Sequence, residues 1–171
     1  MGSVSVAGAK ICWHFVPGGY ADCGLDLLKH GKSDGTRVCV GRMSHSIDPL
    51  TTYVGMLQSW HPDKPIRMLG HCMGGLIAAS LLFDYQDELK DAIISAPAVK
   101  VYDSILPVTR FKDKKLSNSI PTAGLLALDA SGVSSDPQVF KDYIKDPLVY
   151  TGTTTAQLVA VLLGGMQRVT A

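Results

Sequence analysis

The chain has 171 residues, 46% of them hydrophobic, and its 16 basic and 15 acidic residues leave a formal net charge of +1. A chain of this length ordinarily buries one core and forms one domain. Because charges of both signs are mixed along the sequence, no field would gather nucleic acid or an anionic membrane, and we expect no nucleic-acid partner.

The cysteine pattern argues against a metal site. Cys12, Cys23, Cys39 and Cys72 include no C-x-x-C pair of the kind that zinc sites use, so we expect no metal and no cofactor. No basic segment followed by an apolar one opens the chain, and no apolar run reaches transmembrane length. The expectation is a reduced, soluble, cytoplasmic protein without a transmembrane segment.

Two strands are predicted near the start of the chain. The apolar run 11–16 predicts the first strand, and residues 17–19 stop it with Pro-Gly-Gly. Weak alternation over 19–28 predicts a second strand, although Asp22 and Gly24 are disfavoured there. A polar turn over 29–35 follows, and His14 is given no functional role.

A helix is predicted to begin at Asp48-Pro49, since an acidic N-cap followed by proline is a common helix start. Its apolar face would consist of residues at helical spacing, namely Leu50, Tyr53, Val54 and Leu57. Trp60-His61-Pro62 would end it. We expect His45 and His61, which flank this helix, to be solvated loop residues.

The stretch 65–79 predicts a short buried strand, a corner between Gly70 and Gly74, and a helix. This is the outline of a nucleophile elbow, in which the residues two before and two after the nucleophile must be small. Cys72 stands at the central position, where the helix N-terminus can stabilise a thiolate or an oxyanion. The simpler alternative is a Gly-rich strand-to-helix turn with a buried structural cysteine.

The remaining elements complete an α/β pattern. Residues 91–97 predict a second short buried strand, and the strand–helix–strand order argues for right-handed units and a parallel sheet. From residue 98 prolines divide the chain into short pieces, which indicates a helical insertion. One helix is predicted from Asp136-Pro137 to Asp146-Pro147, with Val139, Phe140, Tyr143 and Ile144 as its apolar face. A second is predicted from Thr153 to Arg168, with Gly164-Gly165 inside it.

Several motifs resemble those of the α/β-hydrolase family, within it the monoacylglycerol lipase and lysophospholipase group. Gly70-His71-Cys72-Met73-Gly74-Gly75 resembles the G-H-S-M-G-G elbow, with cysteine in place of serine. Residues 30–35 (HGKSDG), 95–98 (SAPA) and 146–149 (DPLV) resemble further segments of that group, in the same order. The resemblance implies a truncated α/β-hydrolase, with a mostly parallel sheet, a nucleophile elbow and a helical cap.

The resemblance also assigns the parts of the chain and their roles. Residues 1–97 would be a partial hydrolase core and 98–171 a cap-like region of the same folding unit. Cys72 would be the nucleophile, the Met73 backbone N–H an oxyanion donor, and Gly70, His71, Gly74 and Gly75 the supports of the elbow. The substrate would be a lipid-like carboxylic ester, such as an acylglycerol or lysophospholipid. A thiol tolerates a missing base better than a serine hydroxyl does.

The chain lacks several catalytic features of the group. No residues match the triad Asp and His, and only residues 14–17 stand near the expected oxyanion loop. Ester hydrolysis would therefore be weak. The alternative is an inactive hydrolase fragment that binds an apolar ligand or another protein. Strands left without neighbours would then favour self-association or a complementary chain.

Overall fold

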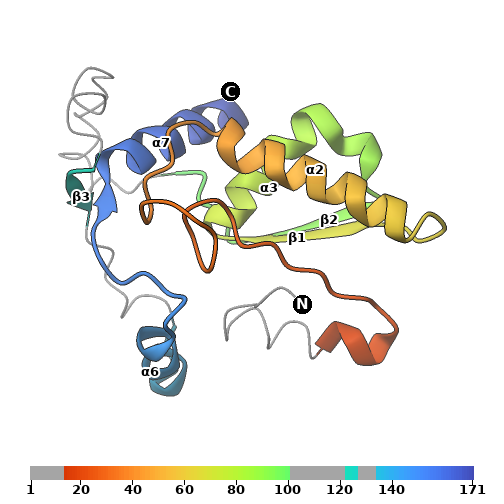
Figure 1. Ribbon diagram of the computed structural model, residues 1–171, viewed down its shortest axis with the longest axis horizontal. Coiled ribbons are helices and arrows are strands. Elements are labelled where there is room, and N and C mark those ends of the chain that lie inside the picture. The colour runs from red at the N-terminus through yellow and green to blue at the C-terminus, as the bar shows by residue number, and fades with distance from the viewer. Residues whose placement is uncertain (1–13, 101–121, 127–133) are drawn as a thin grey trace.

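The structure is a computed structural model that describes residues 14–100, 122–126 and 134–171. Its elements in chain order are η1 (Val16–Gly18), α2 (Ser44–Trp60), β1 (Arg67–His71), α3 (Met73–Tyr85), η2 (Gln86–Glu88), β2 (Asp91–Ser95), β3 (Gly124–Leu126), α6 (Pro137–Lys145), β4 (Thr154–Thr155) and α7 (Ala156–Thr170). Strands β1 and β2 pair in parallel, and β3 and β4 form a short antiparallel pair. In Figure 1, α2, α3 and α7 lie on the same side of the parallel strands.

The predicted strand–helix–strand unit is confirmed. Arg67 pairs with Asp91 at one end of the β1–β2 register and His71 with Ser95 at the other. Arg67, a charge that is costly inside a sheet unless paired, forms an ion pair with Asp91 at 2.9 Å. Helix α3 joins the two strands and contacts both of them.

The core lies on the helix side of the sheet, in two clusters. The first contains buried Val38, Val40 and Leu158, and the second contains buried Ile47, Ile77 and Leu81. Met73 packs against both clusters, so the first residue of α3 connects them. The sheet, α2 and α7 all contact α3. This explains why α3 carries apolar residues on several sides.

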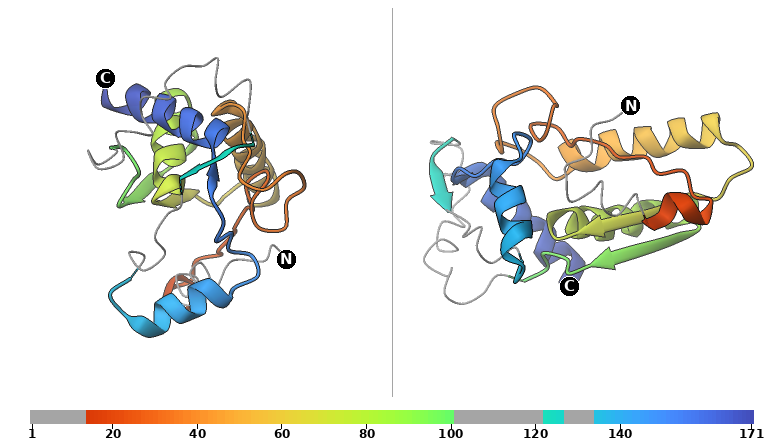
Figure 2. Two further views of the ribbon diagram at one scale, coloured as in Figure 1. Left: turned by 90° about the vertical axis from the view of Figure 1, so that its left-hand side faces the viewer. Right: turned by 90° about the horizontal axis from the view of Figure 1, so that it is seen from below.

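The strand β2 is in the predicted place, but the prediction that it is buried is wrong. All five of its residues are exposed, Ile93 to 50%, and on β1 Leu69 is 41% exposed. Figure 2 (right) shows the two strands from below, with α3 behind them, α2 above them in the view and α7 to their left. None of these three helices covers the near face, which leaves apolar side chains in contact with solvent.

The two predicted N-terminal strands are also wrong as far as the structure describes them. His14 and Phe15 are helical and lead into η1, whereas residues 11–13 lie outside the described part. An edge-to-face contact between Phe15 and Tyr20, at 5.8 Å between centroids, closes this turn. Residues 20–27 have no regular structure. A strand needs a partner for its backbone groups, and the weak alternation here did not supply one.

The helix α2 begins at Ser44 rather than at Asp48, and Pro49 lies inside it. Ser46 and Ile47 in the first turn are buried, and Ile47 packs in the second cluster. This burial offsets the hydrogen bond that proline removes. His45 consequently lies in the helix and not in a loop, whereas the end at Trp60 and the half-buried to buried apolar face are as predicted.

The C-terminal helices agree with the sequence except at one boundary. Asp136 caps α6 by accepting a hydrogen bond from the Gln138 N–H at 2.8 Å, and the helix ends at Lys145. The second helix, α7, begins at Ala156 instead of Thr153, because Thr154–Thr155 pair with β3 and Thr155 then caps the helix. The division of the chain at residue 97 stays a prediction, and the segments 101–121 and 127–133 lie outside the described residues.

Candidate active site

Cys72 forms the corner between β1 and α3, with φ 53° and ψ −117°. A positive φ is uncommon for a non-glycine residue and marks local backbone strain. Three backbone hydrogen bonds hold the corner: the Cys72 N–H donates to the Ser95 carbonyl at 3.1 Å, and the Cys72 carbonyl accepts from the Leu76 and Ala98 N–H groups at 3.1 and 3.0 Å. This backbone geometry is that of a nucleophile elbow.

The two glycines of the elbow pattern differ in their surroundings. A Cβ on Gly70 would lie 2.5 Å from the Gly74 carbonyl oxygen and 2.9 Å from the Ala78 Cβ, so no larger residue fits. A Cβ on Gly74 would meet nothing within 4 Å. The second close approach is instead at Gly75, whose Cβ would lie 3.0 Å from Pro97.

His71 does not face the thiol as a base would. It is the last residue of β1, and its Nδ1 lies 3.2 Å from the Ser95 Oγ on β2. This contact ties the end of β1 to the end of β2. A role of His71 in holding the elbow is consistent with it.

Met73 points its side chain into both core clusters. As the first residue of α3, its N–H has no carbonyl partner within the helix, and among the described residues no hydrogen bond engages this N–H. The half-buried side chain anchors the backbone at the start of α3, directly after Cys72. This is the position that an oxyanion donor needs.

The Cys72 side chain is exposed, unlike that of a structural cysteine such as Cys39, which is buried. Within residues 14–100, 122–126 and 134–171 no histidine or carboxylate forms a hydrogen bond with the Cys72 thiol. Of the described histidines, His30 contacts the Leu28 carbonyl, His61 ends α2, and His71 contacts Ser95. Among the described residues the corner therefore combines an exposed thiol at Cys72 with the free N–H of Met73, and no histidine or carboxylate is hydrogen-bonded to the thiol.

The segment 95–98 does more than the sequence indicated. Ser95 supplies a backbone acceptor and the hydroxyl beside His71, Pro97 limits the space at Gly75, and Ala98 donates to Cys72. The resemblance of this segment to its counterpart in the hydrolases was visible in the sequence. Its role as the support of the corner was not, because it depends on contacts across the sheet.

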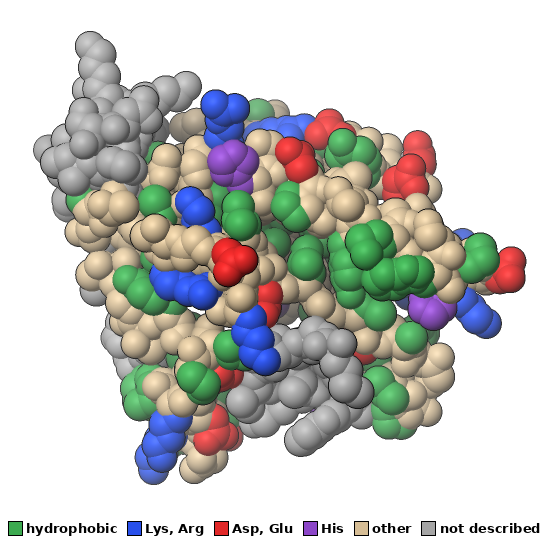
Figure 3. Space-filling view, viewed as in Figure 1, with side chains coloured by type: hydrophobic (Ala, Val, Ile, Leu, Met, Phe, Trp, Pro, Cys, Tyr) green, Lys and Arg blue, Asp and Glu red, His purple; other side chains and the backbone are tan. Residues whose placement is uncertain are grey.

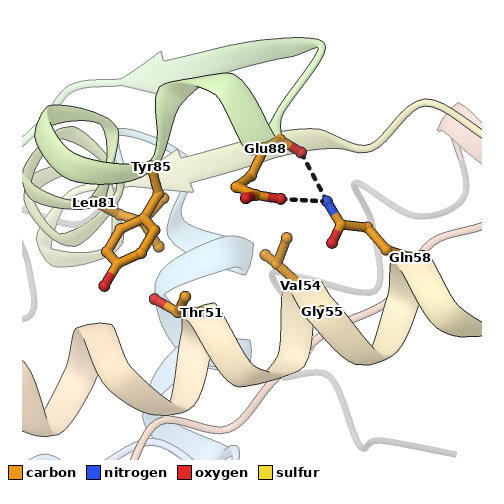
Figure 4. Close-up of a pocket in the computed structure, with 7 residues that line it drawn as sticks. All are labelled: Thr51, Val54, Gly55, Gln58, Leu81, Tyr85 and Glu88. Carbon is orange, nitrogen blue, oxygen red and sulfur yellow. Dashed lines mark hydrogen bonds between the residues drawn. The ribbon is translucent and has the colours of Figure 1, made fainter.

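Neither of the two cavities described here is lined by an elbow residue. One, of about 170 Å³, lies between α2 and the end of α3, where Glu88 accepts a hydrogen bond from Gln58 at 2.8 Å through its carboxylate (Figure 4). The other lies beside the turn at 29–37. The described residues contain no group of three or more His, Cys, Asp or Glu side chains that could hold a metal ion, and none of their helices is long and apolar enough to cross a membrane.

A parallel β–α–β unit with a strained strand-to-helix corner is typical of α/β-hydrolases. The comparisons agree, since the model of the hydrolase family described as serine aminopeptidase, S33 matches residues 1–171. The chain belongs to this family.

The chain is similar to several members of the monoacylglycerol lipase group. It is similar to a monoacylglycerol lipase of Mycolicibacterium smegmatis, with 36% identity over 140 residues that cover 82% of this chain and 50% of the relative. Its fold is similar to that of a Paleococcus ferrophilus monoacylglycerol lipase, with a TM-score of 0.69 and 24% identity over 82% of this chain and 52% of that one. It is also similar in fold to a monoglyceride lipase variant of Saccharomyces cerevisiae in complex with a substrate analogue, with a TM-score of 0.69, 19% identity and coverage of 84% and 49%. The chain spans about half the length of these relatives.

Proposed function

We propose that Cys72 acts as the nucleophile of a weak carboxylic-ester hydrolase. The observation that carries the proposal is the strained corner at Cys72, which presents an exposed thiol at the start of α3. In this proposal the sulfur attacks the ester carbonyl carbon, the oxyanion accepts a hydrogen bond from the Met73 N–H, and collapse expels the alcohol as a thioester forms. Water then cleaves the thioester and releases the acid.

The substrate class proposed is a lipid-like ester, such as an acylglycerol or a lysophospholipid, and the site of action is the cytoplasm. Relatives named monoacylglycerol lipase and monoglyceride lipase support the substrate class, and the substrate analogue bound to the yeast relative supports an apolar ligand. The rate is expected to be low, because the described residues place no general base at the thiol and no general acid to protonate the leaving alkoxide.

Hydrolysis of p-nitrophenyl esters tests the proposal. Wild-type protein should release p-nitrophenol slowly, and Cys72→Ala should abolish the release. Cys72→Ser should be no faster than the wild type, since a hydroxyl needs a base more than a thiol does. Activity that survives in Cys72→Ala would overturn the proposal, and a fast Cys72→Ser enzyme would reveal a base.

Alkylation measures the reactivity of the Cys72 thiol independently of ester hydrolysis. Cys72 should react with iodoacetamide faster than the buried Cys39 and faster than Cys23, which is exposed. It should also react faster than Cys12, which lies outside the described residues. Both Cys72 and Cys23 are accessible, so a faster reaction at Cys72 would report its position at the helix N-terminus. Mass spectrometry of partly alkylated protein gives the order, and equal labelling of Cys23 and Cys72 would contradict the special role of the corner.

A second candidate function is a non-catalytic module that associates through the open sheet. It is favoured by the exposure of Leu69, Ile93 and Ile94 and of the whole of β2. Such a surface, with a strand edge beside it, favours pairing with a second copy of the chain or with a complementary polypeptide. Sedimentation at low micromolar concentration should show association that Ile93→Lys weakens. A monomer that binds no apolar dye would contradict this candidate.

A further inference from the structure

A second concave site lies away from the elbow, between the turn at 29–37 and the segment that follows α6. Its cavity has a volume of about 170 Å³. Lys29, His30 and Arg37 line it from the turn, and Leu148, Val149 and Tyr150 line it from the opposite segment. Segments more than a hundred positions apart in the sequence thus face one another across this cavity.

The charge of the cavity wall has one sign. Lys29, His30 and Arg37 are basic, and no Asp or Glu lines the cavity. The ion pairs of the described residues, Arg67–Asp91 and Arg168–Asp84, involve none of the three. Figure 3 shows blue Lys and Arg side chains over the turn that Figure 1 draws in orange, with a few red acidic ones near them.

Two neighbouring carboxylates are engaged by backbone groups. Asp26 accepts a hydrogen bond from the Lys32 N–H at 3.0 Å, and the Asp146 Oδ1 accepts one from the Leu148 N–H at 2.9 Å. These bonds fix the two segments that form the cavity walls. The carboxylates shape the site without lining it.

Internal contacts hold the turn in its shape. Arg37 Nη1 donates to the Ser33 carbonyl at 2.8 Å, and Lys29 Nζ donates to the Cys39 carbonyl. The His30 Nδ1 lies 3.0 Å from the Leu28 carbonyl oxygen, which can only accept, so Nδ1 carries the hydrogen in this bond.

The backbone of the turn is strained at one residue that is not glycine. Lys29 has φ 66°, and Gly31 has φ 53° with no room for a Cβ beside Asp26. A strained residue that persists is a reason to look for a function. The strained residue, Lys29, is one of the three basic residues that line the cavity.

The size and the apolar wall limit the ligand. A cavity of about 150 Å³ is known to hold benzene, so this one, at about 170 Å³, has room for a small head group and a short apolar body. Leu148, Val149 and the ring of Tyr150 form an apolar wall opposite the basic residues. A free inorganic anion would leave that wall without contacts, whereas an uncharged alcohol would leave the cations without an anionic partner.

We propose that this cavity binds an amphiphile with one anionic head, a carboxylate or a phosphate monoester, on a short apolar chain. Lys29, His30 and Arg37 contact the head, and the segment 148–150 contacts the chain. The site is separate from Cys72 and does not depend on ester hydrolysis there.

The experiment titrates the full chain with hexanoate and with hexyl phosphate, and follows amide resonances of Gly31 and Val149 by NMR. Both amphiphiles should bind saturably and compete with each other. Hexanol, which lacks the charged head, and inorganic phosphate, which lacks the apolar chain, should each bind about tenfold more weakly. Tighter binding of hexanoate would identify a carboxylate as the head, and tighter binding of hexyl phosphate a phosphate. Hexanol binding as tightly as hexanoate, or no saturable binding by either amphiphile, would overturn the proposal.

Variants supply the matched test. Arg37→Gln should weaken hexanoate binding about tenfold, Arg37→Lys should retain most of it, and Lys64→Gln, an exposed cation outside the cavity, should leave it unchanged. If circular dichroism shows that Arg37→Gln is unfolded, His30→Gln replaces it. Equal losses in Lys64→Gln and in the cavity variant would show that only net charge matters and would overturn the proposal.

Discussion

Helix α3 and strand β2 belong to the same β–α–β unit, yet they differ in burial. Ile77 of α3 is 2% exposed, whereas Ile93 of β2 is 50% exposed. The helix contacts the sheet, α2 and α7. The strand contacts β1 and α3, and its opposite face is open (Figure 2).

This difference shows how the corner at Cys72 is supported. On the helix side, packing holds it, because Met73 lies in both core clusters and Gly70 allows β1 and α3 to approach closely. On the sheet side, hydrogen bonds from the end of β2 hold it. A strained backbone conformation persists where its surroundings over-determine it.

The largest effect is expected when two isoleucines, one on α3 and one on β2, are each replaced by alanine. Ile77→Ala should lower the free energy of unfolding by about 2 to 5 kcal/mol, because it removes buried methyl groups and leaves a cavity. Ile93→Ala should cost less than about 1 kcal/mol, since the side chain is half exposed. Urea unfolding followed by circular dichroism measures both. Equal losses would mean that β2 is covered in solution.

The second test concerns the glycines of the elbow. Gly70→Ala should lower the free energy of unfolding by about 1 to 3 kcal/mol, because its Cβ meets backbone and the close approach must open. Gly74→Ala, next to open space in α3, should be neutral or slightly stabilising. Thermal unfolding of both variants gives the comparison. A larger loss for Gly74→Ala would contradict the packing described.

A smaller effect is expected for the ion pair across the open sheet. Arg67 and Asp91 lie 2.9 Å apart with side chains 40% and 56% exposed, so solvent screens them. A double-mutant cycle with Arg67→Gln and Asp91→Asn should give a coupling of about 0.2 to 1 kcal/mol that decreases in high salt. A coupling several times larger would indicate that the pair is shielded from water.

The smallest effect concerns Tyr53 of α2. Its pKa is raised above 10.0, first by burial and then by Cys23 and Asp22 beside it. Since the folded-state pKa lies above the unfolded one, this contribution to stability is full below pH 10.0 and is lost as the pH rises through the folded pKa. Tyr53→Phe should therefore lose less stability on going into this alkaline range, measured by urea unfolding as a function of pH. The same pH dependence in both proteins would show that other groups are responsible.

The sequence predicted the elements whose signals are local. The glycines around Cys72 predicted the corner, and Asp136-Pro137 predicted the start of α6. The position of β2 was also predicted, because a short apolar run ended by proline is a strong local pattern. The resemblance to the hydrolases, carried by motifs in order, agrees with the family match.

The errors arose where distant contacts decide the structure. The start of α2 depends on the burial of Ile47 against α3, which outweighs the preference of Asp48-Pro49 for a helix start. The burial of Val38 and Val40 against α7 and the short β3–β4 pair were not predicted either. The cavity between residues 29–37 and 147–150 could not be found from either segment alone.

The backbone of Cys72 has a consequence for motion. One carbonyl accepts from both Leu76, in α3, and Ala98, beyond β2. The amide hydrogens of these two residues can exchange with solvent only when that carbonyl releases them. In native-state hydrogen exchange they should share one opening free energy, so that the helix start and the chain after β2 form a single cooperative unit.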